Sequence, residues 1–151
     1  MYQIKTVQHF PVPPENMWDF IATPKNLAVI TPEAMGFKTL SGDDMKMYPG
    51  QIIDYTITPL LGIKINWVTE ITHVEAGHYF VDEQRFGPYA FWHHKHFLKK
   101  TDFGCEMVDI VHYKVPFGIL GQLIHPFVVR PKLEAIFEFR RKKLIELFGT
   151  I

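Results

Sequence analysis

Up to Val115, the chain consists mainly of short segments in which apolar and polar residues alternate, the pattern of strands buried on one side. The expected strands are Tyr2–Phe10, Gly36–Leu40, Gln51–Thr58, Ile63–Glu75, His78–Phe86, Ala90–Lys100 and Gly104–Val115. The breaks between the last five are short and contain Gly or Pro, which is typical of hairpin loops. The pattern therefore predicts an antiparallel meander for the second part of the sheet.

A helical period replaces this alternation near the C-terminus. At about 3.6 residues per turn, one apolar face runs onward from Pro131. Its members are Leu133, Ile136, Phe137, Leu144, Leu147 and Phe148. Pro131 suits the first helical position, where no N–H donor is needed, and Gly149 suits the stop. Arg140 interrupts the apolar face. Two shorter helices are expected over Pro14–Ala22 and Pro24–Ile30.

The closing helix needs a large apolar surface to pack against, and nearly everything before it is predicted strand. The expected fold class is therefore α+β. We expect a seven-stranded antiparallel sheet that curves around a long C-terminal helix, with two short helices after the first strand. The 151 residues show no repeats and no linkers, so a single domain, 1–151, is predicted.

The hairpin loops predict which side chains share the covered face of the sheet. Closing the last hairpin over Thr101–Gly104 sets His96 opposite Asp109, and closing the previous one over Gly87–Tyr89 sets Asp82 opposite His94. The expected inner face contains Trp67, Thr69, Ile71, Phe80, Asp82, Gln84, Trp92, His94, His96, Leu98, Met107, Asp109, Val111 and Tyr113. Buried polar groups need partners or water, so this mixture of rings and polar groups predicts a cavity.

Three apolar loops are expected to meet at one end of the meander, because alternate hairpin turns lie at opposite ends. They are Pro59–Gly62, Gly87–Phe91 and Pro116–Leu120, whereas Glu75–His78 and Thr101–Gly104 at the other end are largely polar. We interpret the apolar end as the entrance to the cavity, although the same loops would also serve as a plain cap on the core. The expected entrance residues are Leu60, Leu61, Tyr89, Phe91, Phe117, Ile119 and Leu120.

Composition narrows the classes of partner. Aromatic residues make up 15% of the chain and include thirteen Phe, and a core so rich in rings is hard to fill without gaps. The net charge is zero and no element has a basic patch, which excludes nucleic acid as the expected partner. Cys105 is the single cysteine and no signal segment is recognised, so a cytoplasmic protein without internal disulfides is expected.

The segment His94-Lys95-His96 places two imidazoles on one strand face, a spacing that some metal sites use. A catalytic zinc site needs a third ligand, for which Asp109 and Asp82 are the cross-strand candidates. The favoured interpretation is a pair of hydrogen-bonded histidines, each held by a carboxylate. We therefore expect no metal and no cofactor.

The same groups are the candidate catalytic residues. A histidine beside a carboxylate in an apolar cavity could remove a proton next to a carbonyl, as an aldol cyclisation or a dehydration requires. His96 with Asp109, or His94 with Asp82, are the candidate pairs, and Tyr113 or Arg140 would polarise the carbonyl. The alternative is a purely structural network. Arg140 itself has two interpretations: its stem covers the core with the head in water, or it pairs with an inner carboxylate or a ligand.

One run of residues resembles a known superfamily. Phe80–Gln84, Gly87–Tyr89, Trp92–Phe97, then Asp109, Tyr113 and Pro116–Gly118 are similar to the START-like superfamily, often labelled SRPBCC. It includes polyketide cyclases, lipid-transfer domains and the birch-pollen allergen, and the motif resembles a subfamily of uncharacterised bacterial proteins. The resemblance covers essentially the whole chain. It implies the helix-grip fold, with a hydrophobic cavity between the sheet and the long helix.

The resemblance implies no single activity, because members bind lipids, quinones, hormones and polyketides, and only some are enzymes. The predicted function is binding of a lipid, isoprenoid, quinone or polyketide-like molecule, as a carrier or sensor. A cyclase or dehydratase is the alternative, and a third class is a module whose apolar loops dock transiently on a protein or membrane. The expected ligand-binding residues are Trp67, Phe80, Asp82, Gln84, Trp92, His94, His96, Asp109, Val111, Tyr113, Phe137 and Arg140.

Overall fold

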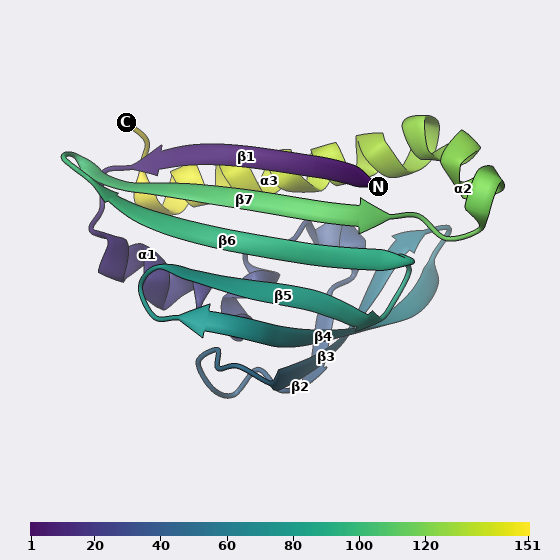
Figure 1. Ribbon diagram of the computed structural model, residues 1–151, viewed down its shortest axis with the longest axis horizontal. Coiled ribbons are helices and arrows are strands. Elements are labelled where there is room, and N and C mark those ends of the chain that lie inside the picture. Colours follow the sequence, from purple (N-terminus) through teal and green to yellow (C-terminus); the bar gives the residue numbers. More distant parts are fainter.

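A computed structural model describes residues 1–151 except the side chain of Leu60, and it has one antiparallel sheet and one long C-terminal helix (Figure 1). The first elements are β1 (Tyr2–Phe10), α1 (Pro14–Ile21), the 3₁₀ helices η1 (Pro24–Ala28) and η2 (Glu33–Met35), and β2 (Lys38–Ser41). The meander follows as β3 (Gln51–Leu60), β4 (Ile63–Glu75), β5 (Tyr79–Phe86), β6 (Phe91–Thr101) and β7 (Gly104–Lys114). The chain ends with α2 (Gly118–Ile124), the π-helical η3 (His125–Val129) and α3 (Arg130–Phe148).

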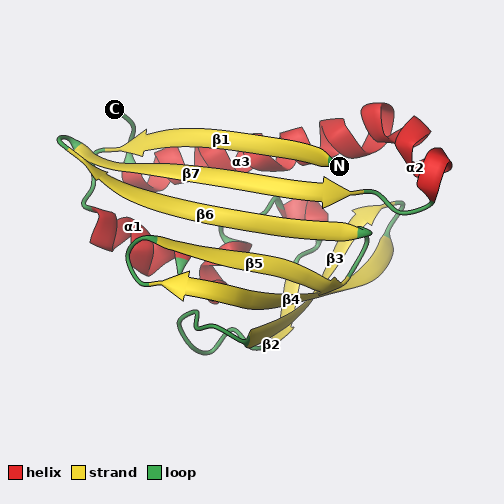
Figure 2. Ribbon diagram, viewed as in Figure 1, coloured by secondary structure: helices red, strands yellow, loops and turns green.

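The seven strands form one sheet in the order β1-β7-β6-β5-β4-β3-β2. The α+β helix-grip architecture predicted from the sequence is confirmed. Figure 2 shows α3 running along β1 and β7, with α2 extending past the end of β7. Among the described residues, no helix combines the length and the apolar character that crossing a bilayer would require.

The predicted pairing of the last hairpin is confirmed. His96 lies opposite Asp109 and Trp92 lies opposite Tyr113, because the tight turn at Thr101–Gly104 sets the register of both strands. Asp82 lies opposite His94, also as predicted. Between β4 and β5 the register shifts at two irregularities that the loop lengths do not reveal. Such bulges bend a sheet and increase its twist, which helps this one to curve around α3.

The beginning of the closing helix was predicted wrongly. Helical structure starts at Gly118, in a segment expected to be a loop, and continues through Pro131. Proline has no N–H, and its ring collides with the carbonyl four residues earlier in a regular α-helix. The π-helical segment relieves this conflict with a wider turn, in which the Arg130 N–H donates to the His125 carbonyl. A single helical path therefore passes the proline instead of starting at it.

The inner face of α3 contacts the sheet through its central residues. Leu133, Phe137 and Leu144 are buried, as the helical period predicted. Leu147, which was expected on the same face, is exposed in the last turn. The helix ends at Phe148, as expected from Gly149. The apolar face is thus narrower at the C-terminal end than the sequence pattern indicated.

A compact cluster of buried side chains closes the end of the molecule beneath α1. It consists of Phe10, Met17, Ile30, Leu98, Cys105, Met107 and Leu144. The Cys105 thiol is fully buried there, and burial raises its pKa, so it is a packed side chain without nucleophilic character. This cluster fills one end of the space between sheet and helix, and three of its members, Ile30, Met107 and Leu144, also form the near wall of a cavity.

Candidate functional site

A cavity of about 570 Å³ lies between the concave face of the sheet and the helices. Its walls come from the inner side chains of β3–β7, from η1 and η2, and from α2, η3 and α3. Nine of the twelve residues predicted to bind a ligand line it: Trp67, Phe80, Asp82, Trp92, His94, His96, Asp109, Phe137 and Arg140. The mixed inner face inferred from the hairpin registers therefore becomes the wall of a real cavity.

The other three predicted residues do not line this cavity. Val111 is fully buried in the core. Gln84 turns to the next loop, where its Nε2 donates to the Tyr89 carbonyl over 2.7 Å and its Oε1 accepts from the Tyr89 N–H over 3.1 Å. Tyr113 forms a hydrogen bond of 2.8 Å with His125. The sequence analysis correctly placed all three on the inner face of the sheet. Their side chains contact other protein groups instead of the cavity.

The polar part of the wall is a closed ring of two histidines and two aspartates. His94 Nε2 lies 3.0 Å from Asp109 Oδ1, and His96 Nδ1 lies 2.8 Å from the same oxygen. On the other side, His96 Nε2 lies 2.7 Å from Asp82 Oδ2, whereas His94 Nδ1 is 3.6 Å from it. His96 thus lies between both carboxylates, whereas His94 is hydrogen-bonded to Asp109 alone. The hydrogen bonds join His94 to Asp109 and His96 to Asp82, the reverse of the two candidate pairs expected from the sequence.

The ring geometry assigns different charges to the two histidines. Burial lowers the pKa of His96. The hydrogen bonds to Asp109 and Asp82, together with the negative charges of these two carboxylates, outweigh this effect and hold the pKa of His96 above its usual range. Both of its nitrogens then donate. Burial and the neighbouring charge of His96 lower the pKa of His94, which stays neutral. Two carboxylates and one imidazolium therefore leave the ring with one negative charge.

Burial also raises the pKa values of Asp82 and Asp109, but neighbouring charged and hydrogen-bonding groups lower them by more. Desolvation raises the pKa of Asp109, but hydrogen bonds from His94 and His96 together with their charges bring it far below the ordinary value. The pKa of Asp82 is lowered as well, with a contribution from the positive charge of Arg140. Arg140 balances the remaining negative charge of the ring, so these five groups are neutral together.

Arg140 lies in the cavity wall, which settles the open question of its orientation. Its guanidinium sits over the Phe137 ring, with Cζ 5.2 Å from the centroid, and its Nε is buried without a hydrogen-bond partner among the described residues. Trp67 Nε1 on the facing sheet is likewise buried and unpartnered. The cavity therefore has one unused N–H donor on the helix side and one on the sheet side.

The histidine pair has only part of what a metal centre needs. Asp82, His94 and His96 offer ligand atoms that all lie within 4.8 Å of one another. The two imidazole rings lie close together but tilted, with centroids 3.7 Å apart and an angle of 34° between their planes. However, both rings already turn a nitrogen to the same carboxylate oxygen, Asp109 Oδ1, and His96 Nε2 is hydrogen-bonded to Asp82 Oδ2, so the candidate ligands are engaged with one another. We interpret this arrangement as a hydrogen-bonded network, and the absence of a metal stays a prediction.

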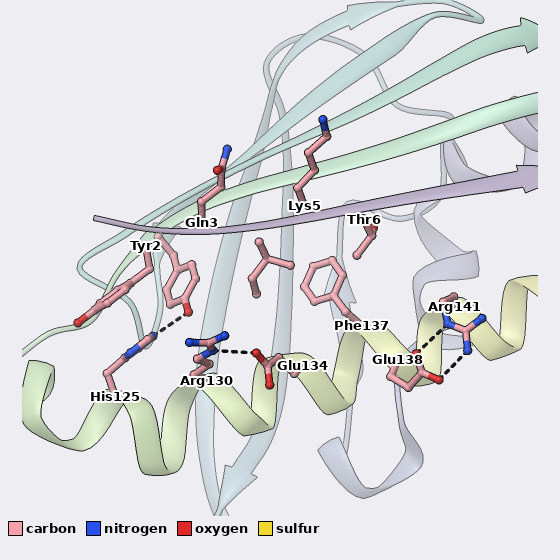
Figure 3. A pocket seen from close by; sticks show the side chains of 12 residues that line it. Tyr2, Gln3, Lys5, Thr6, His125, Arg130, Glu134, Phe137, Glu138 and Arg141 are labelled. Carbon is pink, nitrogen blue, oxygen red and sulfur yellow. Dashed lines mark hydrogen bonds and ion pairs between the residues drawn. The ribbon is translucent and has the colours of Figure 1, made fainter.

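A second groove, of about 450 Å³, lies between β1 and α3 (Figure 3). Six of its polar side chains are paired with each other: Tyr113 with His125, Arg130 with Glu134 and Arg141 with Glu138. The ring of Tyr2 stacks on His125 with centroids 3.6 Å apart. Because most of its polar groups are engaged in this way, we place the site in the other, larger cavity.

Sequence reasoning missed one contribution to the site. Ile53, Tyr55 and Ile57 on β3 line the cavity, and their alternation in the sequence is a signal that would have revealed them. The ring of Tyr55 stacks on Trp67 at 5.8 Å, so β3 extends the aromatic wall begun by β4 and β6.

Three of the seven residues predicted at the entrance line the cavity. Leu61, Tyr89 and Phe117 line the cavity, and Figure 1 shows the β3–β4, β5–β6 and β7–α2 connections at the same end. Phe91 does not line the cavity. It is the first residue of β6, where its side chain alternates with that of inward-facing Trp92, and it stacks with His93 on the outer face. The side chain of Leu60 lies outside the described residues. Ile119 and Leu120 belong to α2 and are exposed outside the cavity lining.

Known structures with this architecture can now be compared. The chain matches no protein-family model, and no curated protein matches it. The solved structure of protein CV1439 from Chromobacterium violaceum is similar, with a TM-score of 0.74, 16% identity and 100% of each chain covered. For TTHA0849 from Thermus thermophilus the TM-score is 0.68 at 13% identity, covering 97% of this chain and 99% of that one. The fold is a helix-grip fold.

The structure of Ara h 8.0201 is a further neighbour, with a TM-score of 0.61 and 14% identity, covering 96% of this chain and 98% of that chain. At such low identity a structural likeness establishes the fold and carries no activity from one protein to the other. The function must therefore be argued from the cavity and its polar groups.

Proposed function

We propose that this protein binds an apolar small molecule, such as a lipid, isoprenoid, quinone or polyketide-like compound, as a carrier or sensor. The observation that supports this proposal is the cavity of about 570 Å³ between sheet and helix. Its size falls within the range of small-molecule sites, and it combines a mainly apolar wall with a few polar groups. Hydrophobic burial would supply the affinity, and the polar groups would orient the ligand.

The aromatic wall is suited to a flat or elongated apolar body. Trp67 meets Trp92 edge to face at 5.3 Å, and Tyr89 lies 4.9 Å from Trp92. Aromatic contacts of this kind hold a bound ring by offset or edge-on packing. A ligand lying against these rings would reach the His/Asp ring, Arg140 and the unused Trp67 donor at the polar side of the same cavity.

Entry is proposed at the apolar end of the sheet. Leu61 and Phe117 are the two non-glycine residues with positive φ among the described residues, at 52° and 65°. Both line the cavity and are strongly exposed, with 92% and 82% of their surface accessible. Bulky side chains in the left-handed region are strained, and such strain gathers at functional loops. We infer that these two side chains form the gate.

Native mass spectrometry of the protein purified from its own host tests the proposal. The expected result is a retained organic ligand, which is lost when the protein is denatured. In a second measurement, the neutral ketone dye prodan should shift its emission to the blue and quench Trp67 and Trp92. Protein that carries no ligand and leaves prodan emission unchanged would contradict binding in this cavity.

A cyclase or dehydratase is the second candidate, and one observation favours it. His94 and His96 both line the cavity, and their surroundings move their pKa values in opposite directions. Such a divided pair is what acid–base chemistry on a carbonyl compound uses. Turnover of polyketide-like carbonyl compounds, lost in His94→Gln and in His96→Gln, would favour catalysis. Ligand retention without turnover would favour the carrier or sensor.

A further inference from the structure

The two unused donors of the cavity bear on the chemistry of the ligand. Trp67 is only 8% exposed, and both its Nε1 and the Nε of Arg140 are buried without an acceptor among the described residues. Leaving a buried donor unsatisfied costs free energy, and native proteins contain few such groups. Here both residues face the same space from opposite walls, one on β4 and the other on α3.

Several acceptor atoms in the same wall are already engaged by other groups. Asp109 Oδ1 receives both histidines, and Asp82 Oδ2 receives His96. The Tyr55 hydroxyl pairs with Thr69 Oγ1 at 3.3 Å, beside the Trp67 ring. The protein therefore leaves the two N–H groups to something that enters the cavity, and that group must bring acceptor atoms.

The charge balance limits what this acceptor can be. Asp82, Asp109, His96 and Arg140 carry two negative and two positive charges, and His94 is neutral. A carboxylate ligand would add an uncompensated anion to a space with little water. It could be neutralised by a proton on His94, which burial and the charge of His96 oppose, or by a proton on the ligand itself, which then binds as a neutral acid. A neutral acceptor meets both donors without this penalty.

We propose that the ligand is a neutral, carbonyl-bearing apolar molecule, such as a ketone, quinone, ester or lactone, whose oxygens accept from Trp67 Nε1 and Arg140 Nε. The inference rests on the proposed function and narrows its ligand class. Free fatty acids in their anionic form and plain hydrocarbons are both disfavoured. Hydrocarbons leave the donors unpaired, and carboxylates disturb the charge balance.

Three probes of nearly the same shape test this: 2-acetylnaphthalene, 2-ethylnaphthalene and 2-naphthoate, titrated by calorimetry. Trp67→Phe removes the indole N–H and keeps an aromatic ring, and Arg140→Lys keeps the charge and removes Nε. Each variant should weaken the ketone roughly three- to tenfold more than the hydrocarbon, the size of one hydrogen bond. Trp18→Phe, a tryptophan outside the cavity lining, should change neither ratio.

The outcomes separate the two proposals. Equal weakening of ketone and hydrocarbon in both variants would overturn the role of the donors. Binding of naphthoate as tight as that of the ketone would overturn the neutral ligand class. If the wild-type protein binds none of the three probes, the proposed function fails, and this inference fails with it.

A second, independent observation concerns the outside of the cavity mouth. Large apolar side chains are exposed on α2, η3 and the adjoining loops: Leu61, Ile63, Phe117, Ile119, Leu123 and Phe127. Phe127, like Phe117, is 82% exposed. Exposed apolar surface of this extent is unusual for a protein with no partner. It surrounds the entrance, since Leu61 and Phe117 also line the cavity. We call these six side chains the apolar tip.

The two stretches of chain that carry the apolar tip are basic. Between Asp109 and Glu134 the chain has no acidic residue, and between Asp54 and Glu70 it has none either. The same stretches contain Lys64, Lys114, Arg130 and Lys132, of which Arg130 pairs with Glu134. An apolar surface bordered by cations complements a bilayer with anionic headgroups, which attract Lys and Arg near the surface.

We infer that the apolar tip docks on an anionic lipid surface, so that the cavity opens toward the bilayer and a ligand exchanges without crossing water. Flotation with vesicles of phosphatidylglycerol and phosphatidylcholine should recover the protein, and vesicles of phosphatidylcholine alone should recover several-fold less. The double variant Leu123→Ser/Phe127→Ser should lose this binding, and it should still bind prodan because neither residue lines the cavity. High salt should weaken the binding.

Phe103→Ser is the matched control, because Phe103 is 78% exposed at the opposite end, in the β6–β7 hairpin. It should bind vesicles like the wild type. Equal loss in the control, or equal recovery with both kinds of vesicle, would contradict docking through the tip. A dimer in solution that dissociates in the Leu123→Ser/Phe127→Ser variant would assign the tip to a second copy of the chain instead.

Discussion

Asp109 holds His96 through a contact of 2.8 Å between Oδ1 and Nδ1, on the wall of an apolar cavity. The same oxygen also receives His94 Nε2 at 3.0 Å. One carboxylate oxygen thus fixes the orientation of both imidazoles, and the other nitrogens turn toward Asp82. This relationship makes Asp109 the group on which the polar side of the cavity depends.

Replacing Asp109 by Asn should lower the free energy of unfolding by about 3–5 kcal/mol, because it leaves the buried imidazolium of His96 without one of its two counter-charges. Urea denaturation measures this. Glu106→Gln is the control, since Glu106 pairs with His9 on the exposed face of the same strand. It should cost less than about 1 kcal/mol. An Asp109→Asn protein as stable as the control would mean that the ring adds little to the fold.

Stability should be greatest near neutral or slightly acidic pH. The folded pKa of His96 is raised, so its contribution is complete below the ordinary value of about 6.5 and is lost as the pH rises through the folded pKa. The folded pKa values of Asp82 and Asp109 are lowered, so their contributions are lost as the pH falls through the acid range. His94, with a lowered pKa, also destabilises the folded state below about pH 6.5.

Urea denaturation at a series of pH values checks these signs. His96→Gln should remove the decline on the alkaline side, because the titrating group is gone. The decline on the acid side should persist through the aspartates and His94. A wild-type stability that rises steadily between about pH 6.5 and about pH 9 would show that His96 is not held as an imidazolium.

Trp92→Ala should weaken both ligand binding and stability. Trp92 is buried, lines the cavity and contacts Trp67 and Tyr89, so both properties depend on the same ring. Truncation of a buried tryptophan costs about 3–5 kcal/mol. Phe91→Ala is the control, because the neighbouring side chain faces outward. Normal prodan binding by Trp92→Ala would move the site elsewhere.

Protein purified without added metal should contain no stoichiometric zinc or iron. His94 and His96 are hydrogen-bonded to Asp109 and Asp82 at 3.0 and 2.7 Å, so the groups that would bind an ion are already engaged with one another. Inductively coupled plasma mass spectrometry measures the metal content. A ratio near one metal per chain, lost in His96→Gln, would reverse the interpretation.

A charge at the proposed gate should slow uptake more than it lowers stability, because Leu61 and Phe117 line the cavity but are exposed and not part of the core. Stopped-flow mixing of prodan with Phe117→Asp should show a reduced association rate, while the urea midpoint changes little. Phe103→Asp, at the far end, should leave the rate unchanged.

Hydrogen exchange should slow at Pro59–Gly62 and Gly87–Phe91 on adding prodan, whereas Glu75–His78 stays as before. Protection at Glu75–His78 instead would place the entrance at the other end.

The sequence alone determined most of the sheet. Side chains in a strand alternate with a period of two, and a short turn permits few registers, so local patterns were enough to place His96 opposite Asp109 and Asp82 opposite His94. The mixture of rings and charges on the inner face then followed. The closing helix and its C-terminal stop were also visible, because the helical period and Gly149 are local signals.

Only the tertiary structure decided where the long side chains and the helix start would go. Gln84 and Tyr113 found partners in Tyr89 and His125, which lie on other elements, and the helix passes Pro131 because a π-helical turn makes room for it. Whether Arg140 faced water or the cavity likewise depended on the sheet around it. Such choices are made between groups distant in the sequence and brought within hydrogen-bond reach by folding, so no local pattern contains them.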